Sequence, residues 1–364
     1  MKILLLEPFL TGSHRRWAEE LKKFSRHDIH ISGMSGHHWK WRMHGGAVTL
    51  ARKFNESDYT PDLILATDMI DLTTFSALTA KKTFGIPKMV YFHENQLTYP
   101  WNYTDKDVRL KRDHHYGFIN FSTAVCADKI FFNSQHHLES FTRELPAFLN
   151  SFPDHNETGL VEQISQKSRV LYPGMNLEHA DHTRKQNQVP VFLWNHRWEH
   201  DKNPDSFFEI LFKLKKEGFE FELIVLGESY ENAPQIFKSV SSMLGDKILH
   251  WGYVDSYEKY LRLLLSADIL PVTSNHDFFG MSVIEAINAG CYPLLPDRLA
   301  YPEHIPENLR EKYLYADEAE LLEKLKHILR NFPFDGDAGL IQHVKRYDWK
   351  NIIDQYDQAF EEFR

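Results

Sequence analysis

Short apolar runs of strand length recur along the chain, and longer amphipathic stretches lie between them. In the first half such runs occupy residues 2–6, 62–66, 89–92 and 129–132, and residues 72–83 have helical spacing. A strand that is apolar on both faces is typical of a parallel sheet that helices cover on both sides. The pattern therefore predicts a doubly wound α/β domain.

The same pattern starts again after a polar stretch. Residues 176–188 are rich in charge and histidine, which indicates a linker or the start of a new domain, and strand-like runs follow at residues 189–194 and 221–226. A chain of 364 residues also exceeds one ordinary core. We expect two Rossmann-like parallel-sheet domains, over residues 1–173 and 174–345. The amphipathic tail, residues 346–364, either completes the second domain or crosses back to the first as a helix.

Composition limits the kinds of partner. The net charge is −9, whereas a sequence-independent nucleic-acid binder is usually basic, so any RNA contact requires a local patch. The two cysteines, Cys126 and Cys291, form neither a disulfide framework nor a zinc site. The first apolar run ends at Glu7, too early for a signal peptide, and no stretch approaches the ~20 apolar residues of a membrane span. We expect a soluble cytoplasmic protein with no membrane and no obligate protein partner.

The loop after the first strand-like run contains one glycine at the start of a predicted helix. In open α/β sheets, ligands bind at the carboxyl ends of the strands. The Gly-x-Gly-x-x-Gly pattern of dinucleotide-binding enzymes does not occur, but Gly12 is followed by Ser13 and His14. Backbone N–H groups there can approach a phosphate, although Gly12 alone is explained equally well by turn geometry.

Two cations and two acids in the second half form the sharper signal. Arg197 and Lys202 lie five residues apart in a loop after a strand-like run, and Asp277 and Glu285 stand eight apart on either side of Gly280. A diphosphate leaving group needs cations where its charge develops, and a helix start offers free N–H groups to phosphate or sugar oxygens. The two cations alone would be typical of a solvated loop, but the four residues together favour a nucleotide-sugar site.

This set of residues resembles the retaining GT-B glycosyltransferases of family 4. The resemblance implies two facing Rossmann-like domains with the C-terminal helix crossing back. It implies that Arg197 and Lys202 bind the donor diphosphate, that Glu285 binds ribose and that Asp277 contacts the donor sugar. Asp277 departs from the family, which usually has Glu there, and the shorter arm alters reach or sugar preference. Further donor contacts are expected from Gly12, Ser13, His14, Trp251, Phe279, Gly280 and Met281, with core packing an equal alternative for Trp251.

Blocks in the first half resemble a narrower family, the tRNA-queuosine mannosyltransferases. They lie at residues 7–14, 38–42, 91–100, 132–134 and 152–155, and the third contains the long and specific run His-Glu-Asn-Gln-Leu-x-Tyr-Pro. The resemblance implies an enzyme that moves mannose from GDP-mannose to the cyclopentenediol of queuosine in a tRNA anticodon. The nucleotide-sugar would be a substrate, and no cofactor is expected.

The same resemblance assigns residues to the acceptor side. It places His93 beside the transferred sugar, where it hydrogen-bonds a hydroxyl or takes up a proton; a buried structural histidine is the alternative. Two patches mix cations with aromatics, at residues 37–44 and at residues 109–116, and a solvated helix face or a partly buried loop would explain either patch. Cations mixed with aromatics suit splayed anticodon bases. Acceptor contacts are expected from Glu94, Asn95, Gln96, Trp39, Lys40, Trp41 and Arg42.

The implied mechanism retains the anomeric configuration and requires no metal. The leaving phosphate accepts the proton of the acceptor hydroxyl, and cations with backbone N–H groups neutralise the departing charge. Two Asp-x-Asp spellings, at residues 105–107 and 335–337, lie in polar loops rather than after a strand. We interpret them as solvated turns.

Two other functions compete with this one. A family 4 glycosyltransferase that acts on a lipid or polysaccharide would often carry a basic amphipathic helix for the membrane, and the sequence shows no convincing one. A non-catalytic module that binds sugar or RNA would not need the complete set of Arg197, Lys202, Asp277 and Glu285. The set therefore favours an enzyme.

Overall fold

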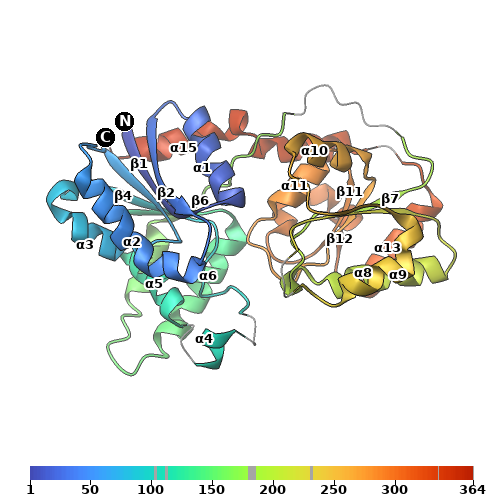
Figure 1. Cartoon of the computed structure of the whole chain (residues 1–364), viewed down its shortest axis with the longest axis horizontal. Coiled ribbons are helices and arrows are strands. Elements are labelled where there is room, and N and C mark those ends of the chain that lie inside the picture. Colours follow the sequence, from blue (N-terminus) through green and yellow to red (C-terminus); the bar gives the residue numbers. More distant parts are fainter. Residues whose placement is uncertain (102–104, 111–113, 179–185, 230–232, 335, 364) are drawn as a thin grey trace. The chain divides into compact units, whose positions relative to one another are not determined.

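The computed structural model describes residues 1–364 except 102–104, 111–113, 179–185, 230–232, 335 and 364. The chain forms two compact units, of which the first contains Met1–Asn176 with Tyr347–Arg364 and the second contains Leu177–Arg346 (Figure 1). Much of the expected linker at residues 176–188 lies outside the described residues. Among the described helices, none is both long and apolar enough to cross a bilayer.

The first unit contains a six-stranded sheet with the order β2-β1-β3-β4-β5-β6, and all the neighbouring strands are parallel. The strands are β1 (Lys2–Leu10), β2 (Asp28–Ser35), β3 (Leu63–Thr67), β4 (Lys88–Phe92), β5 (Lys129–Phe132) and β6 (Ser168–Val170). The helices are α1 (Gly12–Phe24), α2 (Trp39–Glu56), α3 (Leu72–Thr83), α4 (Lys106–Arg109), α5 (His114–Cys126), α6 (Gln135–Leu149), α7 (Leu160–Gln166) and α15 (Trp349–Glu361).

Strand β1 is apolar on both faces because both faces are covered. Ile3 and Leu5 pack with α1 and α15, and Leu4 and Leu6 pack with α2, α3 and α6 on the other side. Each buried side chain of this size contributes about 1.5–3 kcal/mol to stability. The run of strand-length apolar residues at the start of the chain is therefore the centre of this core, as the sequence predicts.

The second unit contains another six-stranded parallel sheet, with the order β12-β11-β10-β7-β8-β9. Its strands are β7 (Val191–Trp194), β8 (Glu222–Leu226), β9 (Ile248–Gly252), β10 (Ile269–Pro271), β11 (Tyr292–Pro296) and β12 (Leu314–Tyr315). Its α-helices are α8 (Pro204–Lys216), α9 (Ile236–Leu244), α10 (Tyr257–Ser266), α11 (Met281–Asn288), α12 (Arg310–Tyr313), α13 (Glu318–Arg330) and α14 (Ala338–Val344). Short 3₁₀ turns include η1 (His200–Lys202) and η3 (Tyr301–His304).

Helix α15 packs in the core of the first unit. Its apolar face, which includes Trp349 and Tyr356, joins Trp17 in the same buried cluster. The indole of Trp17 donates to the Tyr356 hydroxyl at 3.2 Å. Gly174 leaves room for Trp349, because a Cβ atom there would lie 2.3 Å from the indole ring. Of the two placements considered for the tail, the chain thus adopts the one on the first unit.

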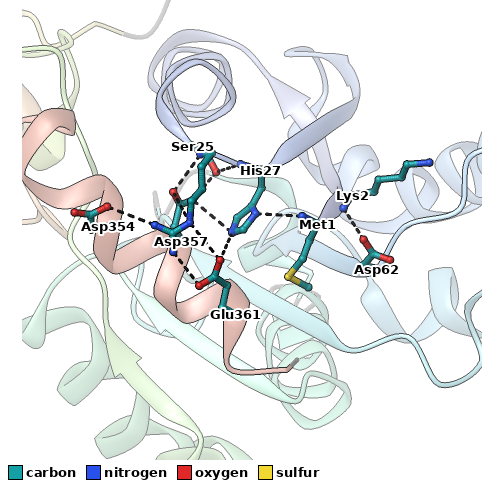
Figure 2. A network of polar contacts seen from close by, with 9 residues as sticks. Met1, Lys2, Ser25, His27, Asp62, Asp354, Asp357 and Glu361 are labelled. Carbon is teal, nitrogen blue, oxygen red and sulfur yellow. Dashed lines mark hydrogen bonds and ion pairs between the residues drawn. The ribbon is translucent and has the colours of Figure 1, made fainter.

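Polar contacts fix the end of α15 to the segment between α1 and β2 (Figure 2). Asp357, which is 2% exposed, accepts from the Ser25 hydroxyl at 2.5 Å and from the Arg26 backbone N–H at 3.1 Å. The Arg26 guanidinium binds Glu361 at 2.9 Å, and His27 Nε2 lies 3.8 Å from Asp357 Oδ1. A buried carboxylate with several donors is costly to remove, because those donors lose their partner.

We predict that Asp357→Ala lowers the free energy of unfolding by about 1–3 kcal/mol, since the part-buried Ser25 hydroxyl and Arg26 backbone N–H lose their buried acceptor. Urea unfolding followed by circular dichroism measures the change. Asp354→Ala is the matched control on the same helix, because Asp354 is 77% exposed and lies 3.7 Å from Arg26. It should change stability by less than about 0.5 kcal/mol, and equal effects of the two variants would contradict the assignment.

Candidate active site

Three chemically active side chains gather at the carboxyl edge of the first sheet. Glu7 lies near the end of β1, Asp68 directly follows β3, and His93 directly follows β4; these strands are neighbours in the sheet. Glu7 is fully buried, and its carboxylate accepts from the Phe9 backbone N–H at 2.8 Å and meets Nδ1 of His14 at 2.9 Å. The helix α1 thus presents His14 to the strand ends.

His93 is held firmly through its backbone. Its N–H donates to Asp68 at 2.7 Å, and its carbonyl accepts from Asn133 at 2.7 Å. Its ring lies 4.4 Å from the ring of His14 and 4.6 Å from that of Trp17. Among the described residues nothing hydrogen-bonds its buried Nε2 atom. A buried polar atom without a partner at a strand end indicates a place where a substrate hydroxyl can bind.

The two histidines differ in charge. Burial disfavours a charged His14, but the carboxylate of Glu7 outweighs it and raises the pKa of His14 to about 9. Burial, together with the neighbouring His14 and His137, lowers the pKa of His93 well below its usual value. At neutral pH the site therefore contains a positively charged His14 beside a neutral His93, and only the neutral ring can both donate and accept a hydrogen bond.

The loop after His93 contains one residue that stabilises the turn and two that can bind a ligand. Asn95 is fully buried, and its side-chain oxygen accepts from the N–H groups of Leu97 and Thr98, so this side chain stabilises the turn. The Gln96 amide donates to Glu94 at 2.9 Å. Of the three residues expected to contact the acceptor, Glu94 and Gln96 keep polar atoms for that role, whereas the amide of Asn95 is used within the turn.

The expected acceptor patch at the start of α2 divides into inner and outer residues. The Trp39 ring lies 5.6 Å from that of Trp101, and Lys40 forms ion pairs with Asp105 at 2.5 Å and Asp107 at 2.6 Å. Trp41, in contrast, is 63% exposed. Arg42 donates to the backbone and hydroxyl oxygens of Ser35.

These ion pairs correct the interpretation of residues 105–107 as a solvated turn. Asp105 caps α4, and Asp105 and Asp107 together neutralise Lys40, because a partly buried ammonium requires a partner. In the second Asp-x-Asp, residue 335 lies outside the described residues, and Asp337 caps α14 and accepts from Tyr313. Residues 111–113 of the second expected RNA patch also lie outside them.

Gly12 is the first residue of α1 and has a positive φ of 50°. Its backbone conformation favours glycine, while nothing lies within 4 Å of a Cβ atom built there. The helix has no side-chain cap and no acid in its first turn, so its first N–H groups remain suited to an anion. Ser13 continues this turn, but the side chain of His14 points to Glu7.

In the second unit, Lys202 forms the centre of a buried ionic cluster. Its ammonium donates to the His276 carbonyl at 2.8 Å and lies 3.2 Å from carboxylate oxygens of both Asp201 and Asp277. Lys202 is 8% exposed, whereas the side chain of Arg197 is 48% exposed and pairs with Glu199 at 3.3 Å. The strand end after β7 thus carries one buried and one accessible cation.

The segment that precedes α11 is organised around Asp277. Its Oδ1 accepts from the Phe279 N–H at 3.2 Å, and its Oδ2 accepts from the Tyr301 hydroxyl at 3.3 Å. Gly280 has a φ of 91° and starts α11 without a side-chain cap, which leaves the N–H groups around Met281 to other acceptors. This geometry matches a site for sugar or phosphate oxygens.

Glu285 and Trp251 occupy contrasting positions. Glu285 is 6% exposed, and its carboxylate accepts from the Tyr260 hydroxyl of α10 at 2.9 Å. Trp251 is half-buried against the hydrophobic core, with its ring 4.9 Å from that of Trp198. Trp251 thus packs on the core with part of its ring exposed, and its contact with the donor base stays a prediction.

Charge and burial are balanced within this cluster. Burial opposes ionisation of Asp277, but Lys202 outweighs it and lowers the pKa of Asp277 to about 2. Burial and Lys202 together lower the pKa of His196 to about 4. Several buried polar atoms here lack hydrogen-bond partners among the described residues, namely Oδ1 of Asn195, Nε2 of His196 and Oδ1 of Asp201. Such a concentration at strand ends indicates a ligand-binding edge.

One group of three possible metal ligands lies within the described part of the chain. The ligand atoms of Glu7, His14 and His93 are all within 4.8 Å of one another. A metal needs deprotonated ligands, and a His14 with a pKa near 9 holds its proton at neutral pH. Because Glu7 already forms a close ion pair with that imidazolium, the group fits a proton better than a metal ion.

Sequence reasoning missed residues that support those it found. Asp68 directly follows a strand-like run, so its position at a strand end was a usable signal. Tyr260, Tyr301 and His304 reach the site from distant parts of the chain, and no local pattern marks them. Burial lowers the pKa of His304 to about 4, and its Nε2 hydrogen-bonds the Phe279 carbonyl at 2.6 Å.

Comparison with known proteins identifies the class. Sucrose-phosphate synthase from Thermosynechococcus elongatus superimposes with a TM-score of 0.72 at 15% identity, covering 100% of this chain and 98% of that one. Anabaena HepE in complex with UDP-glucose gives 0.69 at 13% identity and covers both chains completely. With two six-stranded parallel sheets, the chain has the GT-B fold that the sequence predicts.

The family follows from sequence comparison. Residues 2–175 match the tRNA-queuosine alpha-mannosyltransferase N-terminal family, and residues 176–337 match glycosyl transferases group 1. The tRNA-queuosine alpha-mannosyltransferase of Drosophila melanogaster is 34% identical over 340 residues, which cover 90% of this chain and 87% of the relative. A GDP-mannose:cellobiosyl-diphosphopolyprenol alpha-mannosyltransferase of Xanthomonas oryzae is 22% identical over 66% of this chain and 64% of that protein. The chain belongs to the tRNA-queuosine alpha-mannosyltransferase family.

The buried His304 yields a pH prediction for the second unit. Its folded pKa of about 4 lies below the ordinary 6.5, so the unfolded state takes up a proton first as the pH falls. Stability from this residue is therefore complete above pH 6.5 and is lost as the pH falls toward 4. We expect His304→Gln to reduce the difference in unfolding free energy between pH 7 and pH 4.5 by about 2 kcal/mol.

Urea unfolding at both pH values measures this difference. His327→Gln is the matched control, because His327 lies at an exposed position of α13 in the same unit. The control should keep the wild-type pH dependence. An unchanged pH dependence in His304→Gln would show that His304 is not held neutral by burial.

Proposed function

We propose that this protein transfers mannose from GDP-mannose to queuosine in a tRNA anticodon, with retention of the anomeric configuration. One observation carries the proposal most directly. Lys202 and Asp277 form an ion pair in the loops at one edge of the second sheet, and Glu285 lies on the helix after Asp277, in a chain whose first half matches the queuosine-specific family model. The relative from Drosophila melanogaster bears the name of this activity. Such an enzyme would act in the cytoplasm.

The donor diphosphate would bind at the cations of the second unit. Lys202 is fixed between Asp201 and Asp277, which keeps its ammonium charged while it is buried. Arg197 is more accessible and offers a planar pair of donors to phosphate oxygens. Charges held in place before the reaction stabilise a departing diphosphate without reorganisation. Arg197 and Lys202 are thus the residues that favour loss of the nucleoside diphosphate.

The sugar and ribose would bind on either side of the α11 start. Asp277 already accepts from Phe279, Lys202 and Tyr301, but a carboxylate has about four acceptor positions, so a sugar hydroxyl can occupy another. Glu285 accepts from the Tyr260 hydroxyl, and its carboxylate would also accept from ribose hydroxyls. The backbone N–H groups near Gly280 and Met281 complete this binding edge.

The acceptor hydroxyl would be placed by the first unit. Neutral His93 keeps an unpaired buried nitrogen for a hydroxyl, and its backbone is fixed by Asp68 and Asn133. The phosphate that leaves accepts the proton of the acceptor hydroxyl on the same face of the sugar. This scheme uses no protein nucleophile, no metal ion and no cofactor.

The acceptor can be tested with two pools of tRNA, one that contains queuosine and one from cells that lack it. We expect incubation with GDP-mannose to add a hexose to queuosine in the first pool and nothing in the second, as read by mass spectrometry of nucleosides. Transfer to a polyprenyl-diphosphate glycan, with neither pool modified, would reject the tRNA acceptor and favour the activity named for the Xanthomonas relative.

The role of Lys202 can be tested by substitution. We expect Lys202→Ala to lower kcat for mannosyl transfer by roughly 10²–10³-fold, because the leaving diphosphate loses a fixed charge. Lys215→Ala is the control, since Lys215 lies on α8 and pairs with the exposed Asp246 at 2.9 Å. Removing Lys202 also leaves two buried acids unpaired, so thermal unfolding must confirm that the variant folds.

Arg197→Ala gives a second test of the diphosphate site without that risk, because the side chain is half-exposed. Arg197→Ala should lower the rate of mannosyl transfer from GDP-mannose and leave the thermal unfolding temperature unchanged. Full activity in both folded variants would reject the placement of the diphosphate at these cations.

A further inference from the structure

The exposed indole of Trp41 on helix α2 lies in a space that a glycine of the same helix leaves open. Trp41 is 63% exposed, yet its ring lies against the helix one turn later. A Cβ atom at Gly45 would lie 2.5 Å from Cζ2 and 2.6 Å from Cε2 of the indole. Any side chain at position 45 would therefore displace the ring. Gly45 lies within the 18-residue helix Trp39–Glu56, where glycine destabilises the helix relative to alanine.

The two glycines of this helix have separate functions. At Gly46 a Cβ atom would lie 2.8 Å from Pro8, so this glycine allows the helix to approach β1. At Gly45 the Cβ position meets only the indole of Trp41 among its three nearest atoms. The helix thus contains an unfavourable residue whose visible effect is to leave room for a large exposed aromatic ring to lie flat against it.

The neighbours of Trp41 define the chemistry of its partner. Trp39 packs with Trp101 and Tyr116, and the charge of Lys40 is neutralised by two aspartates, so both half-buried side chains are engaged by neighbours within the fold. Arg42 donates to Ser35 oxygens, and no carboxylate among the described residues forms an ion pair with it. A flat, exposed indole that rests on the helix, next to a guanidinium without a carboxylate partner, suits an unpaired base with its phosphate.

We propose that Trp41 is a stacking platform for an unpaired base of the anticodon loop. Gly45 leaves the space in which the indole lies, and Arg42 contacts a phosphate. This inference rests on the proposed tRNA acceptor and assigns affinity for the loop to Trp41 rather than to Trp39 and Lys40. Stacking on an aromatic ring tolerates any base, because every base has a π face. The platform therefore contributes affinity, while the choice of queuosine is made at the carboxyl edge of the sheet.

The test measures binding of queuosine-containing tRNA over a range of salt concentrations. We expect Trp41→Ala to raise Kd about tenfold and Trp41→Phe to stay within about threefold of wild type, because the phenyl ring still stacks. Gly45→Ala should also weaken binding several-fold while the helix becomes no less stable, since the ring is displaced although it is still present.

The salt dependence separates stacking from charge. Trp41→Ala should leave the slope of log Kd against log salt unchanged, whereas Arg42→Ala should reduce it by about 0.7–1, the value for one lost phosphate contact. Phe84→Ala is the control for an exposed aromatic, because Phe84 is 94% exposed in the same unit and belongs to no proposed site. It should change neither affinity nor slope.

Each outcome has a distinct meaning. If the wild-type protein neither binds nor modifies queuosine-containing tRNA, the proposed function fails and the platform fails with it. If the wild type is active and Trp41→Ala binds tRNA as tightly as wild type, the platform alone is overturned. It is overturned equally if Trp41→Ala loses affinity together with salt slope, because that would show a loss of charge contacts rather than of stacking.

Discussion

Parallel strand direction is the constraint on which the rest of the structure depends. In each unit every neighbouring pair of strands is parallel, so all six carboxyl ends lie on one edge. That edge collects Glu7, Asp68 and His93 in the first unit. In the second it collects the loops that carry Lys202 and Asp277. Residues that are remote in sequence become neighbours because the strands before them run side by side.

The carboxyl edges of the two sheets each stabilise a buried charge with a partner of the opposite sign. In the second unit a buried ammonium is stabilised by two carboxylates, and this arrangement holds the pKa of Asp277 near 2 and keeps Lys202 charged. In the first unit a buried carboxylate stabilises an imidazolium at His14, and the adjoining His93 stays neutral. Under the proposed function, the edge of the second unit would stabilise the charge of the departing diphosphate, and the edge of the first unit would bind hydroxyl groups of the substrates.

The sequence was sufficient for the fold class because buried parallel strands leave a local record. Residues 2–6 are apolar on both faces, and β1 is indeed covered on both sides. The four donor-side residues also carried enough pattern to be grouped before their contacts were known. The ion pairs among these residues could not be predicted in the same way, because the contact between Lys202 and Asp277 joins residues 75 positions apart. Tyr301 and His304 were missed for the same reason.

Predictions from short sequence motifs failed where tertiary contacts determine the role of a side chain. Residues 105–107 have the composition of a solvated turn, but the buried part of Lys40 recruits both acids. Asn95 belongs to the most specific motif of the first half, yet its amide stabilises a turn. Trp39 and Trp41 look equivalent in the sequence, but in the structure Trp39 packs with Trp101 and Tyr116, whereas the exposed Trp41 ring lies over Gly45.

Hydrogen–deuterium exchange with each ligand alone is the most direct test of this division between the units. GDP-mannose should protect residues 195–202 and 277–285 in the second unit, and queuosine-containing tRNA should protect residues 39–48 and 93–98 in the first. Protection of the first unit alone by GDP-mannose, or of the second alone by tRNA, would contradict the assignment of donor and acceptor to the two sheets.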